Sequence, residues 1–257
     1  SEAVYLYRVE SNDTATYLTK VTAPDASDDD DFGWSVSLSG DLLAVGAESA
    51  DSGEETNTGA AYLYRLESND TATYLTKVTA PDGASWDGFS YSISLSGDLL
   101  AVGAWDVEID DMSSVGATYL YRVESNGSTT FLEKLTAPDL EEDAYFGSSV
   151  SQSGDLLAIG AEEALQDDLY AGAVYLYRME SNDTATYLTK VTAPDGDDYD
   201  YFGATVSQLD DRLAVGAYDA DADGKEDAGA VYLYRMESNG SATYLTKVTA
   251  PDGNDFD

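Results

Sequence analysis

The chain has 257 residues, of which 43% are hydrophobic, and this content favours a folded protein over a disordered one. Fifty Asp and Glu residues face only twelve Lys and Arg residues, and the formal charge of −38 argues against binding to nucleic acid or to anionic membrane surfaces. The absence of Cys and His excludes disulfides, zinc–thiolate sites, thiolate nucleophiles and histidine general bases.

The predicted elements recur along the chain. A Tyr-Leu-Tyr-Arg motif returns at intervals of 56 or 57 residues, and a Thr-Ala-Pro-Asp turn keeps the same spacing. The chain therefore begins with a partial unit at 1–31, which holds the last two strands of a unit. Four repeats follow at 32–88, 89–145, 146–201 and 202–257.

Four strands are predicted in each repeat, because segments rich in β-branched and aromatic residues alternate with turn residues. In the last repeat these strands are Phe202–Gln208, Arg212–Ala217, Ala228–Glu237 and Ala242–Thr249.

Both faces of these sheets carry large apolar groups. In the first predicted strand Val4 and Leu6 lie on one face, whereas Tyr5 and Tyr7 lie on the other. Radially packed blades bury both faces of every sheet. The predicted fold is therefore all-β, a β-propeller of four-stranded blades with about four and a half repeats of about 57 residues. An open, β-solenoid-like array is the alternative.

A Phe-Gly pair opens the repeats, and a Gly-Ala pair ends the second predicted strand. These pairs are Phe32-Gly33 with Gly46-Ala47, Phe89 with Gly103-Ala104, Phe146-Gly147 with Gly160-Ala161, and Phe202-Gly203 with Gly216-Ala217. The pattern resembles the FG-GAP repeats of integrin α-subunit propellers and related extracellular proteins over nearly the whole chain. It departs from that family where Ser90 replaces the Gly, and because no Pro follows any Gly-Ala. These departures concern local turn geometry.

The partial unit at 1–31 is expected to be half a blade that lacks its partner strands. Either a distant part of a longer chain closes the ring, or successive molecules complete one another head to tail, because unpaired sheet edges favour strand addition. The expected partners are other copies of this chain or neighbouring repeats of a longer one. No run of about 18 apolar residues is present that would insert into a membrane.

One acidic loop has the spacing of a calcium site. The carboxylates of Asp219, Asp221, Asp223 and Asp227, at positions one, three, five and nine, flank a Gly at position six, and the backbone carbonyl of Lys225 would serve at position seven. The alternative is a solvated acidic loop. The loop joins the second and third strands, whereas the integrin-like calcium loop lies between the Phe-Gly and Gly-Ala motifs, so the family's ligands do not transfer.

Other acidic groups are weaker candidates for cation binding. The corresponding loops of the earlier repeats carry several carboxylates but lack the one-three-five spacing, and a further acidic cluster precedes each Phe-Gly pair. Adaptation to high salt without any specific cation also explains the acidity, since salt screens the self-repulsion of the carboxylates.

Five Asn residues lie in Asn-x-Ser/Thr sequences, the acceptor pattern for N-glycosylation in secreted proteins. They are Asn12, Asn69, Asn126, Asn182 and Asn239. Asn-Asp and Asn-Gly also suit the hairpin turn predicted at these positions without any sugar.

The aromatic residues and carboxylates give no further site. Repeated Tyr pairs on strands are explained by blade packing. Trp34, Trp86 and Trp105 do not recur in equivalent units, which argues against a repeated sugar pocket. No Gly-x-Ser-x-Gly elbow or phosphate-binding loop occurs, so no catalytic residue is assigned and no enzymatic activity is expected.

These features favour an extracellular or cell-surface structural or adhesive protein of a surface layer, appendage or matrix. We expect it to be glycosylated, stabilised by Ca²⁺ and able to assemble head to tail. The alternatives are an integrin-like or lectin-like propeller that binds an extracellular protein or glycan, and a non-catalytic accessory domain of a larger secreted protein.

Overall fold

The computed structural model describes residues 2–27, 29–222 and 224–251. Within these ranges all the regular structure is β, in eighteen strands. A two-stranded sheet contains β1 (Val4–Val9) and β2 (Ala15–Val21). The first blade contains β3 (Phe32–Ser39), β4 (Leu42–Ala47), β5 (Ala60–Leu66) and β6 (Ala72–Val78), and the second β7 (Phe89–Ser96), β8 (Leu99–Ala104), β9 (Ala117–Val123) and β10 (Thr129–Leu135). The third contains β11 (Phe146–Ser153), β12 (Leu156–Ala161), β13 (Ala173–Met179) and β14 (Ala185–Val191), and the fourth β15 (Thr205–Leu209), β16 (Arg212–Ala217), β17 (Ala230–Met236) and β18 (Ala242–Val248).

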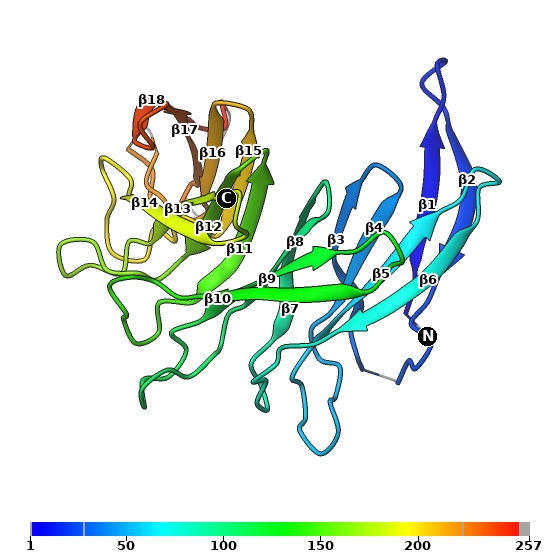
Figure 1. Ribbon diagram of the computed structural model, residues 1–257. Coiled ribbons are helices and arrows are strands. Elements are labelled where there is room, and N and C mark those ends of the chain that lie inside the picture. The colour runs from blue at the N-terminus through cyan, green and yellow to red at the C-terminus, as the bar shows by residue number, and fades with distance from the viewer. Residues whose placement is uncertain (1, 28, 223, 252–257) are drawn as a thin grey trace.

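Every blade is an antiparallel meander in which consecutive strands pair. The sheets follow one another around an arc from β1 and β2 to the fourth blade (Figure 1). The first strands of successive blades, β3, β7, β11 and β15, pack against one another on the inner side of this arc. The predicted all-β propeller fold is confirmed. Among the described residues, no helix has the length and apolarity needed to cross a membrane.

The last blade differs from the strands expected for it at two strand starts. Its first strand begins at Thr205 instead of Phe202, because the ladder with β16 starts at the pair Thr205–Gly216, whereas in the third blade Phe146 is already paired with Ala161. Its third strand begins at Ala230 instead of Ala228. The second strand has the expected bounds.

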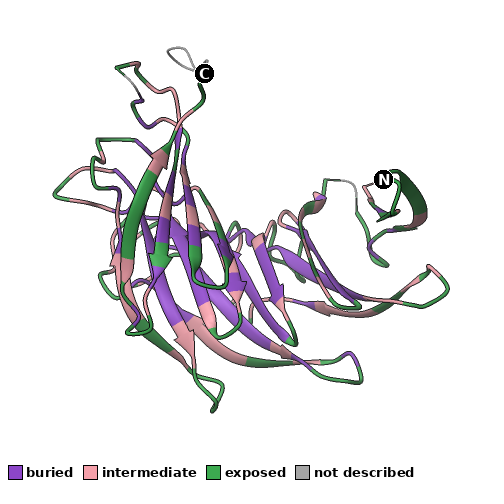
Figure 2. Cartoon of the chain, turned by 90° about the horizontal axis from the view of Figure 1, so that it is seen from above, coloured by how far each residue is buried: buried purple, intermediate pink, exposed green. Residues whose placement is uncertain are grey.

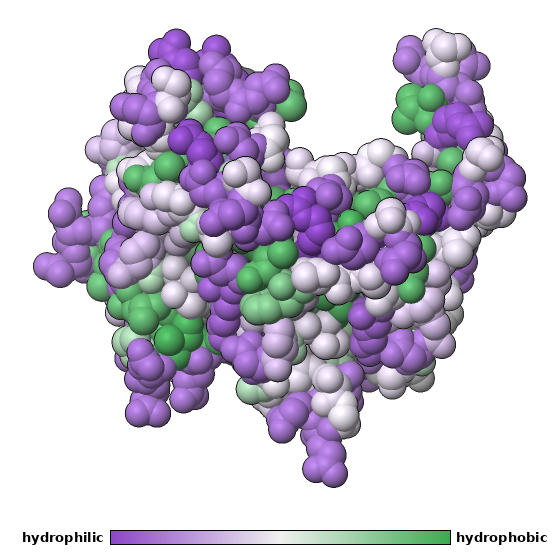
Figure 3. All heavy atoms as spheres, viewed as in Figure 1, coloured by the Kyte–Doolittle hydropathy of each residue, from purple (hydrophilic) through white to green (hydrophobic). Residues whose placement is uncertain are grey.

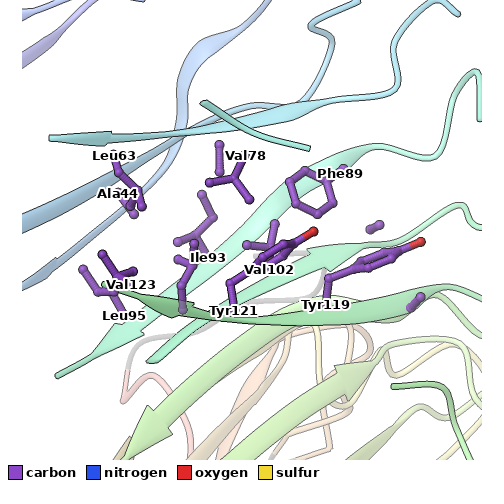
Figure 4. Packing of buried hydrophobic residues seen from close by; sticks show 14 of the residues in the cluster. Ala44, Leu63, Val78, Phe89, Ile93, Leu95, Val102, Tyr119, Tyr121 and Val123 are labelled. Carbon is purple, nitrogen blue, oxygen red and sulfur yellow. The ribbon is translucent and has the colours of Figure 1, made fainter. Parts of the chain in front are cut away.

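The hydrophobic core lies between blades. In one cluster Ala44, Leu63 and Val78 of the first blade meet Ile93 and Val102 of the second (Figure 4). This arrangement explains why both faces of each strand are apolar, since each blade contributes to the cluster on either side of it. Buried residues accordingly run through the middle of the arc, and exposed ones gather on its loops and end strands (Figure 2).

The family motifs coincide with a close approach between the backbones of successive blades. A β-carbon on Gly103, in the Gly-Ala pair of the second blade, would lie 2.0 Å from the carbonyl oxygen of Gly147 in the third. Gly160 stands in the same relation to Gly203, also at 2.0 Å. The Gly-Ala pair therefore gives the Phe-Gly backbone of the next blade room to pack directly on the sheet.

Ser90 takes the place of the motif glycine without changing the backbone. Its φ is 79°, in the same left-handed region as Gly33, Gly147 and Gly203. Its hydroxyl accepts a hydrogen bond from Ala47 N–H at 3.0 Å and donates one to the Ala60 carbonyl at 2.8 Å. These two buried bonds to the preceding blade offset the cost of a positive φ in a residue with a side chain.

The two ends of the arc expose residues that are buried elsewhere. Val36 and Leu38 on β3 are 53% and 57% exposed, whereas Ile93 and Leu95 at the same places on β7 are 9% and 6% exposed. At the other end an apolar hollow of about 370 Å³ opens on the fourth blade between β15, β16, β17 and β18. The end faces thus have the composition of blade-to-blade contacts but lack a covering blade.

Candidate functional site

One end of every blade gathers the loops with the most varied sequences, and we call it the loop face. It contains the loops between second and third strands and the connections from the fourth strand to the next blade. The loops are residues 48–59, 105–116, 162–172 and 218–229, and the connections are 22–31, 79–88, 136–145 and 192–204. The predicted calcium loop lies here.

The described residues of that loop form a small hairpin. Ala222 and Lys225 exchange two backbone hydrogen bonds, so the Lys225 carbonyl expected to bind calcium accepts from Ala222 N–H at 3.1 Å. The Asp221 carboxylate accepts from Asp227 N–H at 3.1 Å. Asp219 lies near Asp227, and burial together with that charge raises the pKa of Asp219. Asp223 lies outside the described residues.

The hairpin does not depend on the acidic spacing. Ser52 with Glu55, Ile109 with Met112, and Gln166 with Leu169 make the same paired backbone bonds in the other repeats. Over the described ranges, no three acidic side chains come together as a metal-binding group. The described part of the loop is therefore no preformed calcium cage, and binding there requires its carboxylates to change partners.

The acidic clusters before the Phe-Gly pairs contain structural carboxylates. Asp30, Asp87 and Asp200 are buried, and each accepts a hydrogen bond of 2.7 to 2.9 Å from the backbone N–H three residues before it. Burial raises the pKa of Asp200 to about 6. These carboxylates close the turn at the start of the first, second and fourth blades, a role that their acidity alone did not indicate. Asp28 of the first cluster is not among the described residues.

The five Asn residues of the glycosylation pattern lie exposed in the hairpins between third and fourth strands, at the end opposite the loop face. In each, the side-chain oxygen accepts the hydroxyl of the Ser or Thr two residues later at 2.7 or 2.8 Å. This bond orders the hairpin, so the recurrence of the sequence has a structural reason that is independent of any sugar.

Aromatic rings form two groups on the loop face. Trp34 contacts Tyr91 at 5.6 Å between ring centroids, Tyr91 contacts Trp105 at 5.5 Å, and Trp105 contacts Tyr145 at 5.3 Å. The second group contains Tyr170, Tyr199, Tyr201 and Tyr218, with Tyr201 and Tyr218 stacked at 4.6 Å. Figure 3 shows hydrophilic residues over most of this face of the molecule, with hydrophobic patches between them.

Several of these rings stand on an unfavourable backbone. In every repeat, the residues one and three places before the Phe of the Phe-Gly motif have a positive φ. Asp29, Asp31 and Gly88 are residue types that tolerate this conformation. Trp86 at 75° and Tyr199 at 64° are not, since a bulky residue in this region costs about 1–2 kcal/mol. Strain of this kind is concentrated at functional sites in proteins.

Trp86 and Trp105 line a cleft of about 190 Å³ between the first and second blades. Glu48, Ser49 and Asn57, from the loop after β4, complete its lining together with Gly88. A β-carbon on residue 88 would lie 2.4 Å from Nε1 of Trp105, so the glycine lets the indole pack over the backbone. Burial raises the pKa of Glu48 to about 7, and the charge of Asp31 adds to this shift.

The sequence-based interpretation missed this cleft because it compared the three Trp residues as members of one set. Trp86 precedes a Phe by three residues, and Trp105 directly follows a Gly-Ala pair. Both positions reach the loop face, so the signal was a pair of aromatic residues that flank the first two strands of one blade. The fourth blade has the same pairing, with Tyr199 and Tyr218.

Comparison with known proteins agrees with this architecture. Four FG-GAP repeats are matched at residues 16–64, 73–121, 129–177 and 186–234, which together make up most of the chain. A crystal structure of a protein from Lactobacillus plantarum superposes with a TM-score of 0.61 at 15% identity, over 98% of this chain and 66% of the other, and at this identity the likeness shows the fold alone. No curated protein matches. The chain belongs to the FG-GAP repeat family.

Proposed function

We propose that this chain is an extracellular, non-catalytic structural or adhesive repeat protein of a cell surface, appendage or matrix. The end faces associate with further blades, supplied by other copies of the chain or by neighbouring repeats of a longer one. The observation that carries this proposal is the exposure of Val36 and Leu38, whose counterparts on β7 are buried by the preceding blade. FG-GAP repeats are typical of extracellular and cell-surface proteins, which supports the proposed location.

Association through the end faces can be tested by sedimentation velocity over a range of protein concentrations. We expect assemblies larger than the monomer, which a Val36→Lys/Leu38→Lys double variant shifts toward monomer. Thr16→Lys on the exposed surface of β2 is the matched control and should leave the assemblies intact. A chain that stays monomeric at every concentration, together with isolated closed rings in micrographs of native material, would sink the proposal.

Glycosylation belongs to the same proposal. The five exposed hairpins would carry sugar at one end of the array, opposite the loop face, and so leave the loops free. Mass spectrometry of hairpin peptides from the native protein tests this. Unmodified Asn in all five peptides would contradict it.

Calcium is proposed as a stabilising ion at residues 219–227. Support comes from the spacing of the carboxylates and from the nearness of Asp219 to Asp227. Lys247 donates a hydrogen bond of 2.6 Å to the Asp221 carbonyl, so a bound cation would have to share this region with an ammonium group.

A second candidate function is that of a ligand-binding propeller, alone or as an accessory domain of a larger secreted protein. The aromatic groups of the loop face favour it, because exposed apolar surface that is rimmed by polar residues marks interaction sites. An extracellular protein or a glycan is the ligand class to be tested.

A further inference from the structure

We propose that the cleft between Trp86 and Trp105 binds a neutral carbohydrate, with one sugar ring placed against the indoles. The inference deepens the second candidate function by naming its site and ligand class, and it is independent of assembly through the end faces.

The cleft has aromatic walls. Trp86 is 63% exposed and has a backbone conformation that disfavours it, whereas Asp occupies the same position before the first and third blades. The Trp86 side chain therefore contributes little to the stability of the fold, and one face of its ring is free to contact a ligand. Indole rings offer a broad apolar surface with one N–H donor, which suits the C–H face and the hydroxyl rim of a pyranose.

The cleft also contains polar groups without a hydrogen-bond partner among the described residues. Within the described ranges, neither the Glu48 carboxyl nor the Asn57 carboxamide makes a hydrogen bond or ion pair with its side chain. Both groups line the same cleft. Partly buried polar groups are stabilised by hydrogen-bond partners. Neighbouring hydroxyls of one sugar ring can form hydrogen bonds with the Glu48 carboxyl and the Asn57 carboxamide at the same time.

The charge around the cleft selects a neutral ligand. Its lining contains a carboxyl group and no Lys or Arg, so sulfated or acidic sugars would be repelled. An organic cation is the alternative ligand for this cleft, since aromatic faces and carboxylates attract cations as well. With its pKa raised to about 7, Glu48 is part-protonated at neutral pH, which weakens it as a counter-ion but lets it both donate to and accept from hydroxyls.

The fourth blade repeats the arrangement with Tyr in place of Trp. Tyr199 and Tyr218 occupy the positions of Trp86 and Trp105, and Tyr170, which stacks on Tyr199 at 5.7 Å, occupies that of Asn57. Glu162 stands where Glu48 stands in the first blade, and burial raises its pKa as well. The first and third blades carry Asp and Glu at the two aromatic positions. Aromatic residues therefore occupy these two positions at alternate blades.

This alternation provides a test variant that the fold already accepts. Trp86→Asp installs the residue found at Asp29 and Asp143, whose φ values of 74° and 59° match that position. Trp105→Glu likewise installs the residue found at Glu48 and Glu162. The matched control is Tyr74→Ala, which removes a partly exposed ring on the outer strand β6. Circular dichroism and thermal unfolding of each variant verify the fold.

The probes are cellohexaose, mannohexaose, xylohexaose and chitin hexasaccharide. Their binding to the full chain is measured by titration calorimetry and by tryptophan fluorescence. We expect saturable binding of a neutral probe that weakens about tenfold or more in Trp86→Asp and in Trp105→Glu. Tyr74→Ala, which lies outside the cleft, should bind within about threefold of the unaltered chain. Glu48→Gln should weaken binding of the neutral probe less than either Trp variant does, because Gln keeps hydrogen-bonding capacity without the charge.

Three results would overturn the proposal. Neutral probes and a printed array of neutral glycans could fail to bind, or they could bind equally well to Trp86→Asp. Spermine or an Arg-rich peptide could instead bind at the cleft and be lost in Glu48→Gln. That last result would keep the ligand-binding function and reject carbohydrate, which separates failure of the inference from failure of the function on which it rests.

Discussion

The backbone of Gly103 lies so close to the carbonyl oxygen of Gly147 that a β-carbon on Gly103 would be 2.0 Å from it. The two residues belong to successive blades, and this contact joins the Gly-Ala motif of one to the Phe-Gly motif of the next. A β-carbon on Gly216 in the fourth blade would also lie 2.3 Å from a side-chain hydroxyl of its own blade, as one on Gly103 would. It would not, however, meet a backbone carbonyl of a following blade.

Gly103→Ala should therefore destabilise the chain by about 1–3 kcal/mol through overpacking between blades. Gly216→Ala is the control, since it meets the same kind of side-chain hydroxyl without the interblade carbonyl, and its effect should be clearly smaller. Urea unfolding followed by circular dichroism measures both. Equal losses would show that the contact within the blade, and not the contact between blades, sets the requirement for glycine.

A second prediction concerns Ser90, which combines a positive φ with two buried hydrogen bonds. Ser90→Ala keeps the unfavourable φ and leaves Ala47 N–H and the Ala60 carbonyl unpaired, so a loss of about 2–3 kcal/mol is expected. Ser90→Gly loses the same bonds but relieves the backbone, and it should be about 1–2 kcal/mol more stable than Ser90→Ala. If the Ala variant were the more stable of the two in urea, the left-handed backbone at this position would be wrong.

A third prediction concerns the hydroxyl of Tyr121, which donates a hydrogen bond of 2.9 Å to the Thr79 carbonyl across a blade junction. Tyr121→Phe removes the donor and should lower the free energy of unfolding by about 0.5–1.5 kcal/mol. Tyr17→Phe on the exposed strand β2 should change it by no more than about 0.5 kcal/mol. Chemical denaturation of both variants in parallel makes the comparison.

A fourth prediction follows from the pKa of Glu48, raised by burial from 4.5 to about 7. The folded chain binds this proton more tightly than the unfolded chain, so the stability that the protonated carboxyl provides is fully present below about pH 4.5 and is lost as the pH rises through 7. Glu48→Gln removes this dependence. The variant should gain stability relative to the unaltered chain between pH 5 and pH 8, and a difference that is independent of pH in thermal unfolding would contradict the raised pKa.

A fifth prediction tests calcium against general salt. If residues 219–227 bind the ion, millimolar CaCl₂ should raise the unfolding temperature more than NaCl of equal ionic strength, and an Asp219→Asn/Asp227→Asn variant should lose the difference. Asp51→Asn in the corresponding loop of the first blade is the matched control. Stabilisation that follows ionic strength alone, alike in all three proteins, would point to screening of the excess negative charge.

The fold could be predicted from the sequence because its signals are repeated. Alternating Tyr and Leu on one strand required two buried faces, and the Phe-Gly and Gly-Ala pairs fixed where each blade begins. The first strand of the last blade was placed too early, because its ladder with β16 starts only at Thr205, a difference that the repeated Phe-Gly motif does not reveal.

The cleft on the loop face could not be predicted in the same way. Glu48, Trp86 and Trp105 come from three separate segments, and only the packing of neighbouring blades places them around one space. The acidic loop shows the opposite limitation. Its spacing is typical of a calcium site, yet a loop with Gln166 and Leu169 in place of acidic residues has the same hairpin.

The four matched repeats begin at the last strand of one sheet and end at the third strand of the next. Each matched unit thus spans a junction, as with the Tyr121–Thr79 hydrogen bond, while Gly103 and Gly147 belong to successive units. Duplicating or deleting one unit in the gene would lengthen or shorten the array while leaving every remaining junction with matched surfaces. The length of the array would then depend on the number of repeats alone, and no new interface would be needed.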